Sequence, residues 1–192
     1  MTSLTKINVT DELPAINQIL SSIGQAPVTT LDQTNPDVAI AYKALLEVNK
    51  EVQAEGWAFN TEYEITITTN DDKQYEVAAN VLQIDLSSTY KGHIDVVRRR
   101  DPADSKVKLY DRYNHTYAIG TVANDKWDVD IIWHFDFIDV PIPIQNYITS
   151  KAATIVAQRI VGDSALIQTL QQRETLARSI ALEYECTQAD YS

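Results

Sequence analysis

Acidic side chains alternate with apolar ones in one segment near residue 130, and they are the first candidates for chemistry. Asp128, Asp130, His134 and Asp136 share one parity, while the odd-numbered positions around them are apolar or aromatic. Same-face positions on a strand lie roughly 6.5–7 Å apart. Inverting glycoside hydrolases separate their two carboxylates similarly, and carboxylates also hold hard cations. No other segment supplies the second half of such a site. We therefore favour the interpretation that these residues form only the polar face of a half-buried strand.

Arg98, Arg99 and Arg100 form the only run of basic residues in the chain. Guanidinium groups bind phosphate and carboxylate oxygens in a bidentate way. The chain carries 16 Lys+Arg against 27 Asp+Glu, a formal net charge of -11. Proteins that bind nucleic-acid phosphates normally show the opposite balance. We therefore expect these arginines to pair with acidic residues of the same or a neighbouring subunit.

Other motifs of catalysis or ligand binding are missing from the sequence. His93, His115 and His134 lack the spacing of a zinc site, and Cys186 is far from all three. The chain contains no Gly-rich phosphate loop, no G-x-S-x-G segment and no H-E-x-x-H segment. The sequence thus predicts no catalytic site, no bound metal and no cofactor.

Composition predicts a globular protein with a substantial core. Of the 192 residues, 44% are hydrophobic and 22% are charged, close to the globular average. A single cysteine allows no intramolecular disulfide, which suits a reducing compartment. No apolar stretch approaches the roughly 18 residues of a membrane helix, and the polar N-terminus lacks the features of a signal peptide. We expect no membrane partner.

Both ends of the chain show helical periodicity. Asp11 is the expected N-cap of a first helix, which Gly24 ends, and Asn35-Pro36-Asp37 opens a second helix that ends at Gly56. A third helix is expected to run to Gly162, and Asp163 or Ser164 would cap a fourth. The apolar stripes predicted for the four helices are Leu13, Ile16, Leu20 and Ile23; Val38, Tyr42, Leu45, Val48 and Val52; Ile144, Ile148, Ala152, Ile155 and Ile160; and Leu166, Leu170, Leu176, Ile180 and Tyr184.

The middle of the chain alternates with a period of two, which predicts strands. The apolar positions are Tyr63, Ile65 and Ile67; Tyr75 and Val77; Leu82, Ile84 and Leu86; Ile94 and Val96; Val107 and Leu109; and the odd positions from Trp127 to Phe137. Asn70-Asp71-Asp72 is an expected turn. The fold class is therefore α+β, with a discontinuous helical domain of residues 1–56 and 141–192 and an antiparallel β domain of residues 57–140 inserted in it.

Three segments, in this order and spacing, resemble a known family. They are Ile19-Leu20-Ser21-Ser22-Ile23-Gly24 with Pro27-Val28 and Thr30-Leu31; Gly56-Trp57-Ala58-Phe59-Asn60-Thr61-Glu62; and Leu109-Tyr110-Asp111-Arg112 with Asn114 and Thr116. The C-terminal part, from Val140-Pro141 to Leu182-Glu183-Tyr184, follows the same layout. The chain resembles tail tubular protein A, the head-to-tail adaptor or gatekeeper of short-tailed, podovirus-type bacteriophages. The resemblance spans nearly the whole chain.

The resemblance implies a structural virion protein of the phage tail, assembled in the cytoplasm of the bacterial host. Such proteins form a dodecamer, a twelve-fold ring between the portal and the nozzle, tail tubular protein B. The helical domain would face the portal, and the β domain would face the nozzle and tail fibres. DNA would pass through the lumen during ejection without sequence-specific binding, so we expect at least two of Arg98, Arg99 and Arg100 to pair with an adjacent subunit or the nozzle.

Two other interpretations and one further interface remain open. The chain could be a weak hydrolase of cell-wall glycans that uses Asp128, Asp130 or Asp136, or a sugar- or protein-binding β module on a helical scaffold. The last residues are expected to follow the final helix and to order against a neighbouring ring, most simply the portal, with the tyrosine as anchor. These residues are Gln188, Ala189, Asp190, Tyr191 and Ser192.

Overall fold

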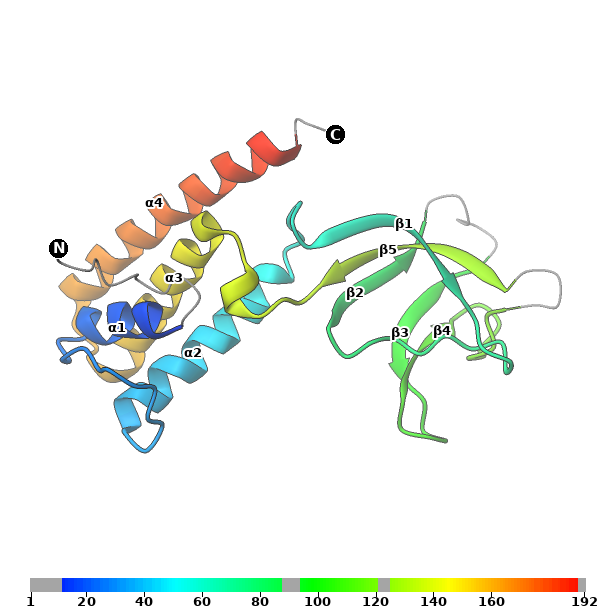
Figure 1. Ribbon diagram of the computed structural model, residues 1–192, viewed down its shortest axis with the longest axis horizontal. Helices are drawn as coiled ribbons and strands as arrows, with labels where there is room; N and C mark the ends of the chain where they lie inside the picture. Colours follow the sequence, from blue (N-terminus) through cyan, green and yellow to red (C-terminus); the bar gives the residue numbers. More distant parts are fainter. Residues whose placement is uncertain (1–11, 88–93, 121–124, 190–192) are drawn as a thin grey trace, which may run out of the picture. The chain divides into compact units, whose positions relative to one another are not determined.

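The computed structural model describes residues 12–87, 94–120 and 125–189 (Figure 1). Its elements form two compact units. The helical unit comprises the described parts of Met1–Val52 and Phe135–Ser192, and the β unit comprises those of Gln53–His134. Helices at both ends of the chain flank antiparallel strands in the middle of the sequence, which confirms the predicted α+β class.

The helical unit is built on four α-helices in the described residues. They are α1 (Leu13–Ser22), α2 (Pro36–Gln53), α3 (Ile142–Ile160) and α4 (Ser164–Ala189), and the short 3₁₀ helix η2 (Phe137–Asp139) precedes α3. Helix α3 packs against both α1 and α4 (Figure 1). Its side chains are buried along most of its length, and Ile144 and Ile148 are fully enclosed. Segments from the two ends of the chain therefore share one core.

Local capping explains where two of the helices, α2 and α4, begin. The Asn35 side chain accepts a hydrogen bond from the Asp37 N–H at 3.0 Å, just ahead of Pro36. The Asp163 side chain accepts hydrogen bonds from the N–H groups of Ala165 and Leu166 at the start of α4. At α1 the cap position is Glu12, which makes no side-chain cap bond. The expected cap, Asp11, lies outside the described residues.

The apolar stripe predicted for α4 is wrong in its central part. Leu176 and Ile180 are 63% and 49% exposed, whereas Ala177 and Ala181 are buried. The buried alanines let α4 lie close to α3, because small side chains permit a near approach of two helix backbones. Helix α4 therefore keeps apolar side chains on an exposed flank.

The β unit contains two antiparallel sheets. Strands β1 (Thr61–Thr68), β5 (Lys126–Trp133) and β2 (Val81–Leu86) form a three-stranded sheet in the order β1-β5-β2, and β3 (Val96–Arg100) pairs with β4 (Val107–Asp111). Val129 and Ile131 of β5 point into a core shared with β2, β3 and β4. The even positions of β5 lie on the outer face, as the alternation predicted.

Three details of the strand prediction are wrong. Tyr75 and Val77 do not form a strand, because only an isolated bridge joins Glu76 to Lys108. The final strand stops at Trp133, and Phe137 lies in η2 with its side chain buried in the helical unit. Tyr63 is 73% exposed, because a β-bulge between Glu62 and Ile65 interrupts the alternation of β1.

Candidate functional site

The acidic residues around position 130 are not gathered into one site. Asp128 accepts a hydrogen bond from the Thr66 hydroxyl at 2.6 Å, and Asp130 accepts one from the Glu64 N–H at 3.0 Å. Asp136 lies beyond the end of β5 and belongs to the helical unit. No group of three or more His, Cys, Asp or Glu in the described residues is placed to hold a metal ion. The two strand carboxylates thus organise the edge of a sheet.

The three consecutive arginines lie on β3 and are exposed. Arg98 donates from Nη1 to the Val81 carbonyl at 2.8 Å, and Arg100 donates to the Ser105 carbonyl. The Arg99 guanidinium lies 4.6 Å from the ring centroid of Tyr110. None of the three forms an ion pair within the described residues. The interface predicted for these arginines remains a prediction.

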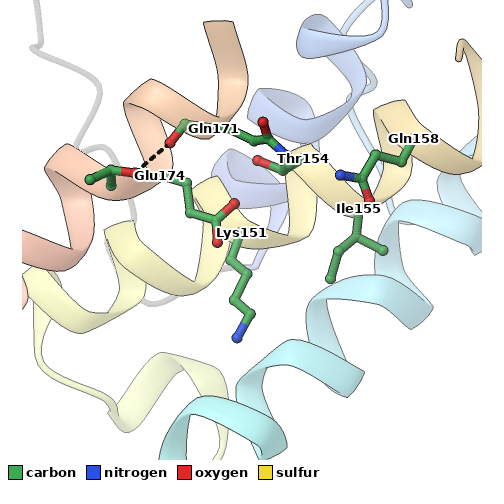
Figure 2. A pocket seen from close by; sticks show the side chains of 7 residues that line it. Lys151, Thr154, Ile155, Gln158, Gln171 and Glu174 are labelled. Carbon is green, nitrogen blue, oxygen red and sulfur yellow. Dashed lines mark hydrogen bonds between the residues drawn. The ribbon is translucent and has the colours of Figure 1, made fainter. Parts of the chain in front are cut away.

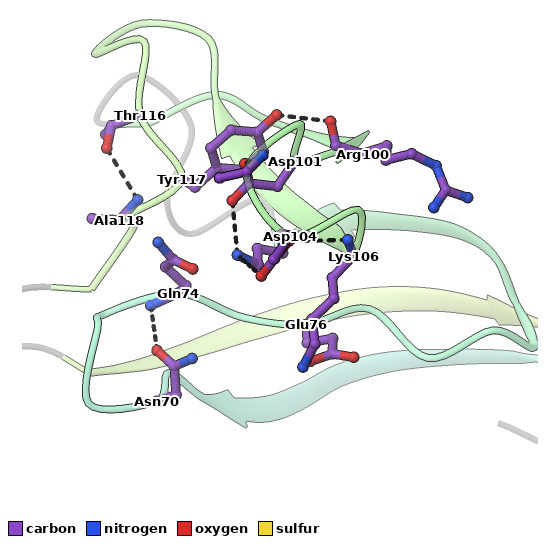
Figure 3. A network of polar contacts seen from close by, with 12 residues as sticks. Asn70, Gln74, Glu76, Arg100, Asp101, Asp104, Lys106, Thr116, Tyr117 and Ala118 are labelled. Atoms are coloured by element: carbon purple, nitrogen blue, oxygen red, sulfur yellow. Dashed lines mark hydrogen bonds and ion pairs between the residues drawn. The ribbon is translucent and has the colours of Figure 1, made fainter.

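A compact ion-pair network holds the turn that joins β3 to β4. The Lys108 ammonium lies 2.7 Å from Asp101 and 2.6 Å from Asp104, and the Lys108 and Asp101 side chains are less than one tenth exposed. Figure 3 shows the surrounding contacts: Lys106 reaches Glu76, and the Tyr117 hydroxyl donates to the Arg100 carbonyl. The network fixes the hairpin that carries the arginines.

The same contacts shift the pKa values of the network. Hydrogen bonds from Lys108, and then from backbone N–H groups, lower the pKa of Asp101 and of Asp104 below 3.8. Hydrogen bonds to Asp101 and Asp104 raise the pKa of Lys108 above 10.5. The network therefore stabilises the fold at pH values between the lowered pKa values of the two aspartates and the raised pKa of Lys108. That contribution is lost as the pH falls through the lowered carboxylate pKa values, or rises through the raised pKa of the lysine.

We expect Lys108→Met to lower the melting temperature at neutral pH and to flatten its fall between about pH 4 and pH 2. Without the ammonium, the two carboxylates lose the largest cause of their lowered pKa values and keep only the bonds from backbone N–H groups, so their proton binding in the folded state moves closer to that of the unfolded state. Melting followed by tryptophan fluorescence across this pH range measures the effect. Lys106→Met, which removes an exposed ion pair with Glu76, is the matched control. Its melting temperature should fall as steeply with decreasing pH as that of the original chain. An equally steep fall of the melting temperature in Lys108→Met would contradict the claim that Lys108 lowers the pKa values of the two aspartates.

A rigid turn follows β4 and presents an aromatic side chain. The buried Asp111 carboxylate accepts bonds from the N–H groups of Tyr113 and Asn114 and from the Asn114 side chain. His115 adopts the left-handed region at φ 56°. Arg112 pairs with Asp95, which precedes β3 in the sequence. Tyr113 is left 79% exposed at the tip.

Asn60 is a buried hub that the sequence patterns did not predict. Its side chain accepts a bond from the Trp57 N–H at 2.8 Å and donates to the carbonyls of Gln53 and Trp133 at 2.9 and 2.8 Å. Its backbone carbonyl accepts a bond from the Trp133 N–H. An asparagine just after a helix-ending glycine was the only available signal, and it is equally typical of an exposed turn.

A groove of about 500 Å³ runs between α3 and α4 in the helical unit. Figure 2 shows Lys151, Thr154, Ile155 and Gln158 from α3 facing Gln171 and Glu174 from α4. The lining is mostly amide, hydroxyl and charged groups. Lys151 also pairs with Glu51 of α2 at 3.0 Å. The groove offers hydrogen-bonding groups but no catalytic arrangement in the residues that line it.

The C-terminal interface candidates divide between α4 and the residues beyond it. Gln188 and Ala189 belong to α4, so the prediction that they follow the last helix is wrong. The helix continues because residues 182–189 contain neither Gly nor Pro. Gln188 is exposed. Asp190, Tyr191 and Ser192 lie outside the described residues.

Exposed apolar side chains are concentrated in the helical unit. Among the described residues, the exposed large hydrophobic side chains of this unit are Ile40, Leu46, Ile138, Ile142, Ile160, Val161, Leu176, Ile180 and Leu182. In the β unit they are Tyr63 and Tyr113. No helix in the described part of the chain is both long and apolar enough to span a bilayer.

Comparison with known proteins gives one family. The family model described as tail tubular protein matches residues 13–191, which covers both units. No curated protein matches the chain.

Proposed function

The chain belongs to the tail tubular protein family, and on this premise we propose that it forms a ring that adapts the portal of a phage to its tail nozzle. The family places the protein in the virion tail as a structural component. The proposed ring has twelve subunits, acts as a gatekeeper and forms part of the channel through which DNA is ejected. The observation that carries this proposal is the family match over nearly the whole chain.

The surface of the helical unit supports assembly. Scattered apolar residues are normal on a monomer, but here they recur on α2, on both ends of α3 and on α4. Obligate interfaces bury such side chains and commonly remove 2,000 Å² or more from solvent. We propose that this unit carries contacts to the portal, and that the β unit faces the nozzle, tail tubular protein B, and the tail fibres.

The charge of the chain suits a DNA channel. Twelve copies at -11 each would carry about -130 in total. Acidic groups on the lumen would keep DNA phosphates from adhering to the wall, so that DNA passes without sequence-specific binding.

Mixing the purified chain with the portal protein of the same phage should produce a stable complex that contains a twelve-subunit ring. Electron microscopy with native mass spectrometry measures the stoichiometry. Removing residues 187–192 should weaken docking to the portal while leaving the melting temperature within a few degrees, because Thr187 and Gln188 are exposed. A chain that stays monomeric with portal would refute the proposed function. Unchanged docking of the shortened chain would refute the C-terminal contact alone.

A further inference from the structure

The arginines of β3 retain unused capacity for binding carboxylates. Each guanidinium has five N–H donors, and each arginine makes one polar or cation–π side-chain contact that the structure describes. Other cations of the β unit, Lys106, Lys108 and Arg112, are paired with carboxylates. The run Arg98–Arg100 of β3, called the arginine strand below, is thus the densest group of cations in this unit, and none of the three forms an ion pair among the described residues.

The three-stranded sheet has an outer surface of the opposite charge. We call Tyr63, Glu64, Asp85 and Asp130 the acidic sheet surface. Asp85 of β2 lies directly opposite Asp130 of β5 in the strand register, and Asp130 holds the Glu64 N–H. Like charges at opposite positions destabilise a pair of strands. A cationic partner at this surface would relieve that repulsion.

An exposed aromatic ring completes the acidic sheet surface. The bulge in β1 holds Glu64 at φ 55°, in the left-handed region, and leaves Tyr63 73% exposed beside it. Backbone strain of this kind persists only where the surrounding structure fixes it. Tyrosine rings bind guanidinium groups through their faces, as Tyr110 does with Arg99 within one chain. Carboxylates and a tyrosine ring together are the groups that bind arginine.

We propose that the arginine strand of one copy docks on the acidic sheet surface of the next copy. The proposal rests on the ring proposed above and names the contact that joins its β units. Two different complementary surfaces on one chain make a head-to-tail contact, which can repeat around a closed ring. The second copy is favoured as occupant because both halves of the charge complementarity are present on this chain. Exposed ion pairs of this kind weaken with salt.

Reversing the charge on either surface should block assembly. The basic-side variant is Arg99→Glu with Arg100→Glu, and the acidic-side variant is Glu64→Lys with Asp85→Lys. Each places like charges against each other, so we expect the concentration needed for half-maximal ring formation to rise at least about tenfold. Arg98 and Asp130 are kept because each binds the backbone of a different strand, Val81 of β2 and Glu64 of β1. The backbone bonds of Arg100 and Asp85 are local, to Ser105 and Leu86. Unchanged melting temperatures will show that both variants still fold.

Mixing the two variants should restore the ring, because each reversed surface then meets an opposite charge on the other variant. Native mass spectrometry should find equal numbers of the two variants in alternating rings, and a chain carrying all four changes should assemble alone. The matched control is Asp71→Lys with Asp72→Lys, an exposed turn with the same change in net charge as the acidic-side variant. The control should assemble like the original chain.

The outcomes separate this contact from the proposed function. If the original chain forms rings and neither variant is impaired, the contact is wrong and the ring stands. If the variants are impaired but their mixture and the combined chain stay unassembled, the two surfaces do not meet each other. If the original chain forms no ring with portal, both proposals fail.

Discussion

A chain that ends at Val140 should lose the helical structure of residues 13–53. Helix α1 has ten residues, and isolated helices shorter than about 12–15 residues are marginal in water. Its buried side chains, including Ile16 and Ile19, pack against α3, which the truncation removes. The truncation also removes Lys151 and Arg159, which pair with Glu51 and Glu47 of α2. Far-UV circular dichroism and hydrogen exchange of residues 13–53 measure the loss.

A chain that ends at Ala189 is the matched control for this truncation. It keeps α3 and α4 whole and should retain helical content and cooperative melting. Slow hydrogen exchange in α1 and α2 of the longer truncation would show that the first two helices fold without the C-terminal pair. That result would contradict a shared core built from both chain ends.

The helices could be predicted from the sequence because their signals are local. Asn35-Pro36-Asp37 and Asp163 mark helix starts by bonds to backbone only two or three residues away. Which face of α4 is buried could not be predicted in the same way. A stripe of large apolar residues predicts burial only when the partner helix needs large side chains, and the residues buried in this part of α4 are instead Ala177 and Ala181.

The strands were predictable as a pattern but not in their interruptions. The alternation of β5 correctly separates Val129 and Ile131 from Asp128 and Asp130. The bulge that exposes Tyr63 depends on the Asp130 carboxylate holding the Glu64 N–H, a contact 66 residues away in sequence. Such a long-range bond leaves no trace in the periodicity of β1.

The contacts of the candidate interface residues could not be predicted either, because they also depend on residues distant in the sequence. Residue type and spacing single out the three arginines as interface candidates, which stays a prediction, whereas their contacts with Val81, Tyr110 and Ser105 depend on how the strands pack. The network around Lys108 could not be predicted, because a lysine between two apolar residues of a strand is expected to lie on the solvent-exposed face. Two aspartates of the adjoining turn make its burial favourable.

Replacing Asn60 by Ala should lower the free energy of unfolding of the β unit by about 2–4 kcal/mol, because three side-chain hydrogen bonds are lost. The substitution leaves the Trp57 N–H and the carbonyls of Gln53 and Trp133 without their side-chain partner in a buried site. A typical intramolecular hydrogen bond contributes about 0.5–1.5 kcal/mol, and the Gln53 carbonyl keeps its bond from the Gly56 N–H. Denaturant unfolding followed by tryptophan fluorescence measures the change. Asn80→Ala is the matched control, because Asn80 is exposed and holds His134 through its backbone carbonyl.

Asn60→Asp should be destabilising in a way that depends on pH. The new carboxylate keeps the bond from the Trp57 N–H but faces two carbonyl oxygens without a proton to donate. Burial and these oxygens favour the protonated carboxyl, so its pKa in the folded state should lie above the usual value of about 3.9. The free energy of unfolding of this variant, relative to the original chain, is therefore highest below about pH 3.9. It falls as the pH rises through the raised pKa of the new carboxyl. A stability deficit that stays constant from pH 4 to pH 8 would mean that the side-chain N–H bonds of Asn60 contribute little, and that the residue acts through its backbone and through the oxygen that binds the Trp57 N–H.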